Sequence, residues 1–307
     1  MSAFSHRDLR LRGIGLMCIA VICFTGIDTI GKYLNQLLPL SQVMWGRFVF
    51  AFLAVCFLPI FGTSNVPPRE IVGSKRMSLQ LLRGLLLVGS TGLNFLALQF
   101  LQLDQALAIM FSVPFMVAAL SIPMLGERVG PRRWAAITVG FLGVLVVTRP
   151  GFGGIHPAAI FSVLCALCYA FYSITTRMLA SSDSSETTLF YSNLPGAVIM
   201  TALLPFVWHS PDKSYLYWVM VAQGVVAALG HYLMILAHRV APASVLAPFM
   251  YTQTVWVICA GYLVFGDLPN RWTVVGAVIV IGSGLYLLYR ERVVRGEAVP
   301  PSIDSMR

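Results

Sequence analysis

Residues 13–31 read GIGLMCIAVICFTGIDTIG, an apolar run of 19 residues that carries a single charged side chain, Asp28. A helix needs about 20 predominantly apolar residues to cross the hydrocarbon core of a bilayer, so this run predicts a membrane-spanning helix. Arg7, Arg10 and Arg12 precede it, as basic residues precede the apolar part of a signal peptide. No small-residue cleavage pattern follows, so we expect the span to be retained.

The composition of the whole chain extends this interpretation. Of its 307 residues, 58% are hydrophobic and 11% are charged, and the mean hydropathy is +0.80. A soluble domain carries about 25% charged residues. We therefore expect a polytopic membrane protein, which disfavours a soluble enzyme, a disulfide-stapled secreted protein and a nucleic-acid-binding domain. The six cysteines all lie in apolar runs, where a free thiol behaves as a small hydrophobe, so neither a disulfide framework nor a metal site is expected.

Ten apolar runs are long enough to cross the membrane, which predicts an all-α fold of ten transmembrane helices. They cover residues 13–31, 41–61, 79–100, 104–125, 134–149, 157–180, 187–208, 214–237, 242–265 and 272–290. What remains of the chain is too short for a sizeable domain outside the membrane.

The basic residues sort to two sides of the membrane when the N-terminus is placed in the cytoplasm. Fifteen of the 21 then lie on the cytoplasmic side and two lie inside spans. The four on the other side are Lys32, Arg149, Lys213 and Arg271. Because cytoplasmic loops carry an excess of Lys and Arg, this distribution predicts a multi-pass protein with both termini in the cytoplasm.

The sequence also contains an internal repeat. A shift of 140 residues brings LGE at 125–127 onto FGD at 265–267, and a shift of 145 near the start of each half brings Lys32 onto Arg177. Each copy holds five spans, an odd number, so the second copy must enter the membrane from the opposite face. Such inverted repeats are typical of secondary transporters. The predicted units are residues 1–150, residues 151–290 and a short cytoplasmic tail at 291–307.

The ten-span layout, the G-E-x-x-x-P stretch at 126–131, its echo at 266–269 and Arg47 in the second span resemble the EamA-type drug/metabolite transporters. The resemblance covers residues 13–290. Within the family, Asp28, Lys32, Gln42, Trp45 and Arg47 are most similar to the bacterial branch of riboflavin and S-adenosylmethionine importers. The resemblance implies a transporter of the bacterial inner membrane that moves a small polar or amphipathic metabolite, such as a vitamin, amino acid or nucleoside-like compound, by alternating access. It implies no cofactor and leaves a coupling ion and a homodimer open.

Ionisable side chains inside spans are costly in lipid and are therefore functional candidates. Asp28 and Lys32 are four residues apart on one helix face, where they form either a structural ion pair or part of a substrate pathway. Arg47 lies six residues into the second span, about 9 Å along the helix. At that depth it is expected either to contact an anion or to pair with Asp28. Arg83, near the cytoplasmic start of the third span, is expected at the membrane interface.

Further candidates for a substrate pathway are polar or aromatic residues within other spans. Such residues can orient or stack a ligand, and they serve equally to join or pack helices. They are Asn94, Tyr172, Gln223, His231, Gln253 and Trp256. His231 and His238 lack an accompanying carboxylate or thiolate, which argues against a metal site. Glu127 and Asp267, which follow spans four and nine, are expected to cap the next helix or to contact the Arg and Trp that follow.

A membrane-embedded enzyme acting on a lipid-linked substrate is the alternative function. Basic clusters at the interface would then hold phosphate, and paired acids or a metal set would be needed for chemistry. The sequence has no H-E-x-x-H or G-x-S-x-G motif and no phosphate-binding glycine motif, which weakens the enzyme hypothesis and argues against transport driven by nucleotide hydrolysis.

Overall fold

A computed structural model describes most of the chain, and every regular element in the described part is a helix. The described residues are 6–57, 71–125, 131–148, 156–179, 182–240, 249–250 and 252–297.

Six of these helices are long and apolar enough to cross a membrane. They are α1 (His6–Asn35), α2 (Leu40–Phe57), α4 (Met77–Leu98), α8 (Ala159–Leu179), α9 (Ser185–Val207) and α10 (Tyr215–Val240). The other helices are α5 (Leu103–Met110), α6 (Val113–Leu125), α7 (Pro131–Thr148), α12 (Gln253–Ala260), the π-helical turn η1 (Gly261–Phe265) and α13 (Arg271–Glu297). The all-helical prediction is confirmed for the described residues, and these other helices fall within or overlap the four remaining predicted spans.

The fourth predicted span is divided between α5 and α6. At the break, the Ser112 N–H donates to the Ile109 carbonyl, which tightens the helix to an i to i+3 pattern, and a new helix starts at Val113. Pro114 follows at once and has no backbone N–H to donate, which is tolerated in the first turn of a helix but not in the interior. Pro114 within the predicted span over 104–125 indicates a kink or a break in that span, and the structure has a break there.

The described part of the ninth predicted span is not a single regular α-helix, because α12 is followed by the π-helical turn η1. Its end, η1, terminates at Gly266, whose φ of 72° lies in the left-handed region that favours glycine. The N–H groups of Gly266 and Asp267 donate to the carbonyls of Tyr262 and Gly261. This turn fixes the position of Asp267 beside the end of α1.

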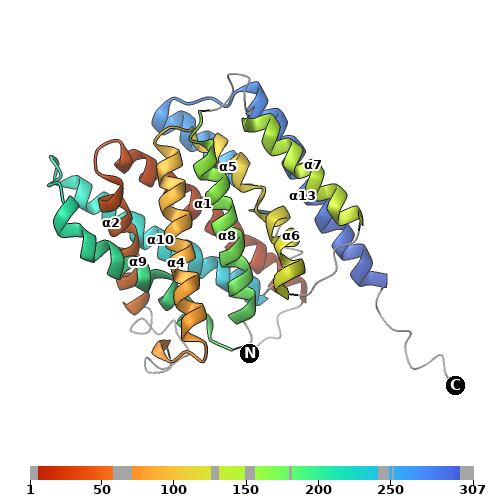
Figure 1. The fold of residues 1–307 in the computed structure, drawn as a ribbon, viewed down its shortest axis with the longest axis horizontal. Coiled ribbons are helices and arrows are strands. Elements are labelled where there is room, and N and C mark those ends of the chain that lie inside the picture. The colour runs from red at the N-terminus through yellow and green to blue at the C-terminus, as the bar shows by residue number, and fades with distance from the viewer. Residues whose placement is uncertain are drawn as a thin grey trace.

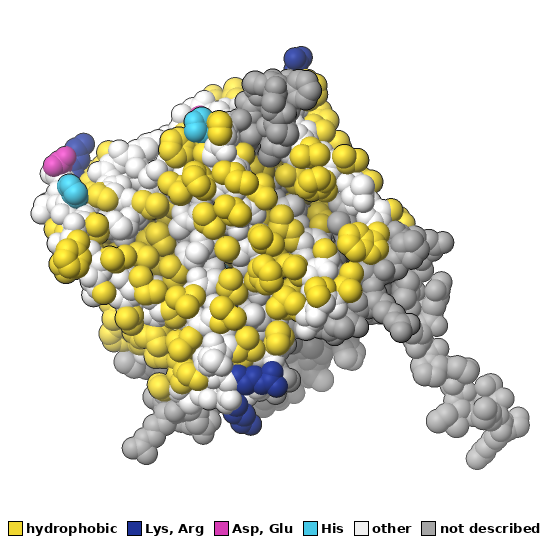
Figure 2. All heavy atoms as spheres, in the orientation of Figure 1, with side chains coloured by type: hydrophobic (Ala, Val, Ile, Leu, Met, Phe, Trp, Pro, Cys, Tyr) yellow, Lys and Arg dark blue, Asp and Glu magenta, His cyan; other side chains and the backbone are white. Residues whose placement is uncertain are grey.

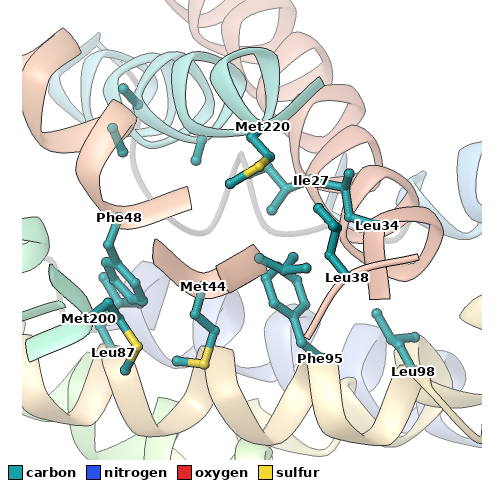
Figure 3. Packing of buried hydrophobic residues seen from close by; sticks show 14 of the residues in the cluster. Ile27, Leu34, Leu38, Met44, Phe48, Leu87, Phe95, Leu98, Met200 and Met220 are labelled. Atoms are coloured by element: carbon teal, nitrogen blue, oxygen red, sulfur yellow. The ribbon is translucent and has the colours of Figure 1, made fainter. Parts of the chain in front are cut away.

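Helices from distant parts of the chain pack in pairs around a shared core. Helix α1 packs on α10, α4 on α8, and α2 on both α9 and α10, whereas α7 and α13 lie side by side at one edge (Figure 1). Figure 3 shows side chains from α1, α2, α4, α9 and α10 that point toward one another in the main hydrophobic cluster. Among them are Ile27, Met44, Phe48, Phe95 and Met220.

The surface has the character expected of a membrane protein. Figure 2 shows hydrophobic side chains across the middle of one face, with the coloured charged and histidine side chains gathered toward opposite edges. Exposed large apolar residues include Phe206, Trp218 and Leu263. Soluble monomers rarely expose a contiguous apolar patch with an area of more than a few hundred Å². Together with the six long apolar helices, this surface identifies a multi-pass membrane protein.

Candidate functional site

Asp28 is partly buried where α1 meets α4. Its carboxylate oxygen Oδ1 accepts a hydrogen bond of 2.8 Å from the Asn94 side-chain amide. Asn94 is neutral, so this bond satisfies one lone pair of the carboxylate without forming an ion pair. The two candidates therefore come together, with the amide as a partner that fixes the carboxylate in place.

Arg47 lies on α2 and is 3% exposed. Its guanidinium stacks over the ring of the adjacent Phe48, 4.4 Å from the centroid, and its Nη1 has no hydrogen-bond partner among the described residues. The ion pair predicted between Arg47 and Asp28 is not formed, since no described side-chain N and O of the two residues approach within 4.0 Å. They still interact electrostatically through the interior.

Lys32 does not pair with Asp28, although the two share a helix face. Its Nζ lies 2.9 Å from Oδ2 of Asp267 and 4.6 Å from the centroid of the Phe265 ring. The structural pair predicted within α1 is thus replaced by a pair between two distant parts of the chain. The prediction that Asp267 caps the next helix is also wrong, because Asn270 accepts the hydrogen bonds from the first N–H groups of α13. Glu127 lies outside the described residues.

Three more candidates lie buried near these charges. The Gln223 side chain is fully buried, and neither its Nε2 nor its Oε1 has a partner among the described residues. His231 is buried with its ring 5.2 Å from that of Phe24. Tyr172 is buried and accepts a hydrogen bond of 2.5 Å from Arg83. We call Asp28, Asn94, Arg47, Gln223 and His231 the central cluster.

The remaining two candidates are not brought into the central cluster. Gln253 is only partly buried at the first turn of α12. Trp256, one turn further, is 42% exposed. A ring this exposed on a membrane helix is better placed to contact lipid than to stack an enclosed ligand.

Arg83 is a buried charged residue that the sequence interpretation misplaced. It is 4% exposed, and its guanidinium donates to the Thr176 hydroxyl at 2.6 Å, to the Thr188 carbonyl at 2.9 Å, to the Ser192 hydroxyl at 2.6 Å and to Tyr172. It therefore joins α4 to α8 and α9 instead of lying at the interface. The signal that could have found it is the set of hydroxyl residues on the facing parts of α8 and α9.

Asp183, between α8 and α9, is a second polar junction that was not predicted. Its carboxylate accepts hydrogen bonds from Ser74 Oγ at 2.5 Å, from Gln80 Nε2 at 2.8 Å and from the Lys75 N–H at 3.2 Å. Partial burial opposes ionisation, but the hydrogen bonds and the Lys75 charge outweigh it, so the pKa of Asp183 is lowered from its ordinary value. We call this end of the bundle the Asp183 end.

The opposite end, which we call the Lys32 end, is joined by neutral hydrogen bonds as well as by the ion pair. The hydroxyls of Tyr33 and Tyr215 lie 2.8 Å apart. The Gln42 side-chain amide donates to the His209 carbonyl at 3.0 Å and accepts from its N–H at 3.1 Å. Trp45 donates to the Thr201 hydroxyl at 3.1 Å. Both ends therefore hold the first half of the chain against the second, with the central cluster between them.

A multi-pass helical bundle that encloses charged and polar side chains between two joined ends has the architecture of a membrane transporter. The EamA-like transporter family matches the chain twice, over residues 11–149 and 156–290. The protein therefore belongs to the EamA-like transporter family. This membership confirms the resemblance seen in the sequence and decides against the membrane-enzyme hypothesis.

Named relatives agree with this assignment. The S-adenosylmethionine uptake transporter of Rickettsia conorii is 28% identical over 284 residues, which cover 92% of this chain and 94% of that protein. The riboflavin transporter of Vibrio cholerae is 27% identical and covers 90% and 93%. A solved crystal structure with a TM-score of 0.62 and 15% identity, covering 94% of this chain and 99% of its own, shows the same fold.

Proposed function

We propose that this protein is a secondary transporter of the bacterial inner membrane that moves a small metabolite by alternating access between two inverted five-helix halves. The observation that carries the proposal is that the helix packing is duplicated across the two halves. If the repeat equates α1, α2, α4 and α7 with α8, α9, α10 and α13, the main contacts among these helices map either onto one another or onto themselves. The α1–α10 contact maps onto α8–α4, and α2–α10 maps onto α9–α4, while α2–α9 and α7–α13 map onto themselves.

This pairing supports ten spans arranged as an inverted repeat, with one half in residues 1–150 and the other in 151–290. The two matches of the family, to 11–149 and 156–290, support the same division. An approximate twofold axis in the membrane plane would pass between the halves, where transporters of this kind place the substrate. The central cluster draws Asp28, Asn94 and Arg47 from the first half and Gln223 and His231 from the second, which supports a substrate site between the halves.

The orientation rests on the charge distribution. An excess of Lys and Arg on one side supports cytoplasmic termini, which puts the Lys32 end on the periplasmic side and the Asp183 end in the cytoplasm. Reporter fusions at the C-terminus and after Lys213 test this: alkaline phosphatase should be active only at Lys213, and activity at the C-terminus would reverse the orientation.

The relatives suggest where the substrate search begins. They are named for uptake of S-adenosylmethionine and for transport of riboflavin, both ring-bearing metabolites with polar groups. Purified protein in proteoliposomes should catalyse entry or counterflow of at least one labelled compound from a panel built around these two. Flux measured with and without proton and sodium gradients would identify a coupling ion. Absence of protein-dependent flux for the whole panel under every gradient would contradict the proposal.

Variants of the central cluster link flux to the site. Arg47→Gln and Gln223→Leu should abolish or strongly reduce flux while the protein still inserts and elutes as a single species. Arg271→Gln, which neutralises an exposed arginine outside the cluster, is the matched control and should retain flux. Unchanged flux in Arg47→Gln would move the substrate pathway away from the central cluster.

A further inference from the structure

The central cluster contains one acidic and one basic side chain, Asp28 and Arg47, and neither forms an ion pair with a described residue. Three basic side chains are buried among the described residues, namely Lys32, Arg47 and Arg83. Lys32 pairs with Asp267, and Arg83 donates four hydrogen bonds to oxygen atoms. Arg47 alone retains a buried N–H group with no acceptor among the described residues. A buried charge without a partner is costly, which makes Arg47 the place where an anionic group of a ligand would be most favoured.

Asp28 presents the complementary case. Its described partner is the neutral amide of Asn94, and no described cation lies within 4.0 Å of its carboxylate. Lys32, one turn along the same helix, is already held by Asp267. The carboxylate is therefore positioned by one hydrogen bond and remains available to a cationic group.

Arg47 and Asp28 interact electrostatically but do not touch. A ligand with only an anionic group would compensate Arg47 and leave Asp28 unpaired, and a cation would do the reverse. A neutral ligand would leave both charges in a medium of low dielectric constant. One molecule that carries both charges compensates both residues at once and adds no net charge to the interior.

Gln223 supplies neutral contacts to the same ligand. Its amide has a free donor and a free acceptor among the described groups, and both are buried. The residue on α1 beside it is Gly31, where a Cβ atom would lie 3.1 Å from Gln223 Nε2 and 2.5 Å from the Phe95 ring. Glycine at this position, three residues from Asp28 on α1, thus leaves room for the amide and the ring.

We propose that the substrate of this transporter is a zwitterion, whose carboxylate binds Arg47 and whose ammonium or other cationic group binds Asp28, with Gln223 contacting a neutral polar group between or beside them. This inference rests on the proposed transport function and narrows its substrate class. It separates zwitterions from neutral ring compounds of similar size, although both could enter a bundle lined by apolar side chains.

Matched ligands test the proposal on the wild-type protein. Thermal unfolding of the purified, full-length protein is measured with L-phenylalanine, L-tryptophan and S-adenosyl-L-homocysteine at millimolar concentration. Each is compared with analogues that lack one or both of the charged groups. Phenethylamine and tryptamine lack the carboxylate, hydrocinnamate and indolepropionate lack the amine, and methylthioadenosine lacks both. A ligand that binds only the native state raises the unfolding temperature. At least one zwitterion should do so, and its truncated analogues should not.

Variants then assign the two charges. Arg47→Gln and Asp28→Asn should each weaken binding of the active zwitterion about thirtyfold or more, as expected when one member of a buried charge pair is removed. Arg271→Gln and Asp212→Asn are the matched controls, because they make the same changes at exposed positions. If a cluster variant does not fold, the comparison of analogues on the wild-type protein still decides the proposal.

Two results would overturn it. One is that no zwitterion of the panel stabilises the wild-type protein, and the other is that a truncated analogue stabilises it as well as its zwitterion. Flux of a neutral compound without binding of any zwitterion would refute this inference and leave the transporter function intact. Absence of flux for every compound would instead refute the transporter function.

Discussion

Removing the ion pair between Lys32 and Asp267 is expected to destabilise the protein by about 2 kcal/mol and to loosen the Lys32 end. The charged atoms lie 2.9 Å apart, and the side chains are 10% and 25% exposed. At an effective dielectric constant near 20, the Coulomb attraction at this distance is about 6 kcal/mol, and desolvation offsets the greater part of it. Exposed pairs contribute about 0.2 to 1 kcal/mol, while breaking a buried pair costs about 3 to 5 kcal/mol, so this partly buried pair lies between.

The assay is a double-mutant cycle on the free energy of unfolding in mild detergent. Lys32→Gln, Asp267→Asn and the double variant are measured together, and the coupling energy should be about 2 kcal/mol. Lys213→Gln and Asp212→Asn change exposed residues near the Lys32 end and serve as matched controls with coupling near zero. If the Lys32 and Asp267 effects are strictly additive, the pair does not contribute to closing this end and the reasoning fails.

Four further outcomes follow from particular contacts. Arg83→Lys should lower the free energy of unfolding by about 2 to 4 kcal/mol, because an ammonium keeps the charge but cannot reach all four acceptors, and wild-type stability would contradict this. Gly276→Ala should cost about 1 to 3 kcal/mol, since the new Cβ would lie 2.4 Å from an α7 side chain and 2.7 Å from an α7 carbonyl, whereas Gly282→Ala, with open space around it, should not destabilise the same helix. Asp183→Asn should lower the unfolding temperature at pH 7, with a difference from wild type that shrinks as the pH falls through the lowered native pKa of Asp183, and a pH-independent difference would contradict the ionised role. Arg47→Met should destabilise the ligand-free protein less than Arg83→Lys does, because removing a buried guanidinium that forms no ion pair offsets the loss of its attraction to Asp28, and a loss comparable to that in Arg83→Lys would show that Arg47 has a structural partner.

The helical fold and its family could be predicted because they depend on features that are visible in the sequence itself, namely long apolar runs and an internal repeat. A run such as residues 13–31 identifies a span from composition alone, and the repeat between 125–127 and 265–267 is visible without coordinates. Pro114 predicts either a kink or a break in the fourth span, and the sequence could not decide between them because a proline is compatible with both a kinked helix and the first turn of a new helix.

The partners of buried charges could not be predicted in the same way. Asp28 and Lys32 satisfy the local rule for a helical pair, yet Lys32 binds Asp267, 235 residues away, because the left-handed turn at Gly266 brings that carboxylate to the end of α1. Arg83 was placed at the interface from its distance to the span boundary alone. Its oxygen partners lie on α8 and α9, and the sequence does not show that these helices pack against α4 at this point. Long-range packing decides both contacts, and a helix periodicity contains no information about it.

The three buried cations show how the fold separates structure from function. Lys32 is neutralised by a carboxylate at one end of the bundle, and Arg83 is surrounded by hydroxyl and carbonyl oxygens toward the other. These contacts join the two halves and hold the bundle together in the absence of a ligand. Arg47 lies between them, buried and without an acceptor for one of its N–H groups among the described residues. A folded protein can keep a destabilising buried charge where a function requires it, provided that other contacts stabilise the fold. Here the contacts at the two ends of the bundle contribute that stability. The charge that packing leaves unsatisfied is therefore the one whose compensation by a ligand would favour the bound state most.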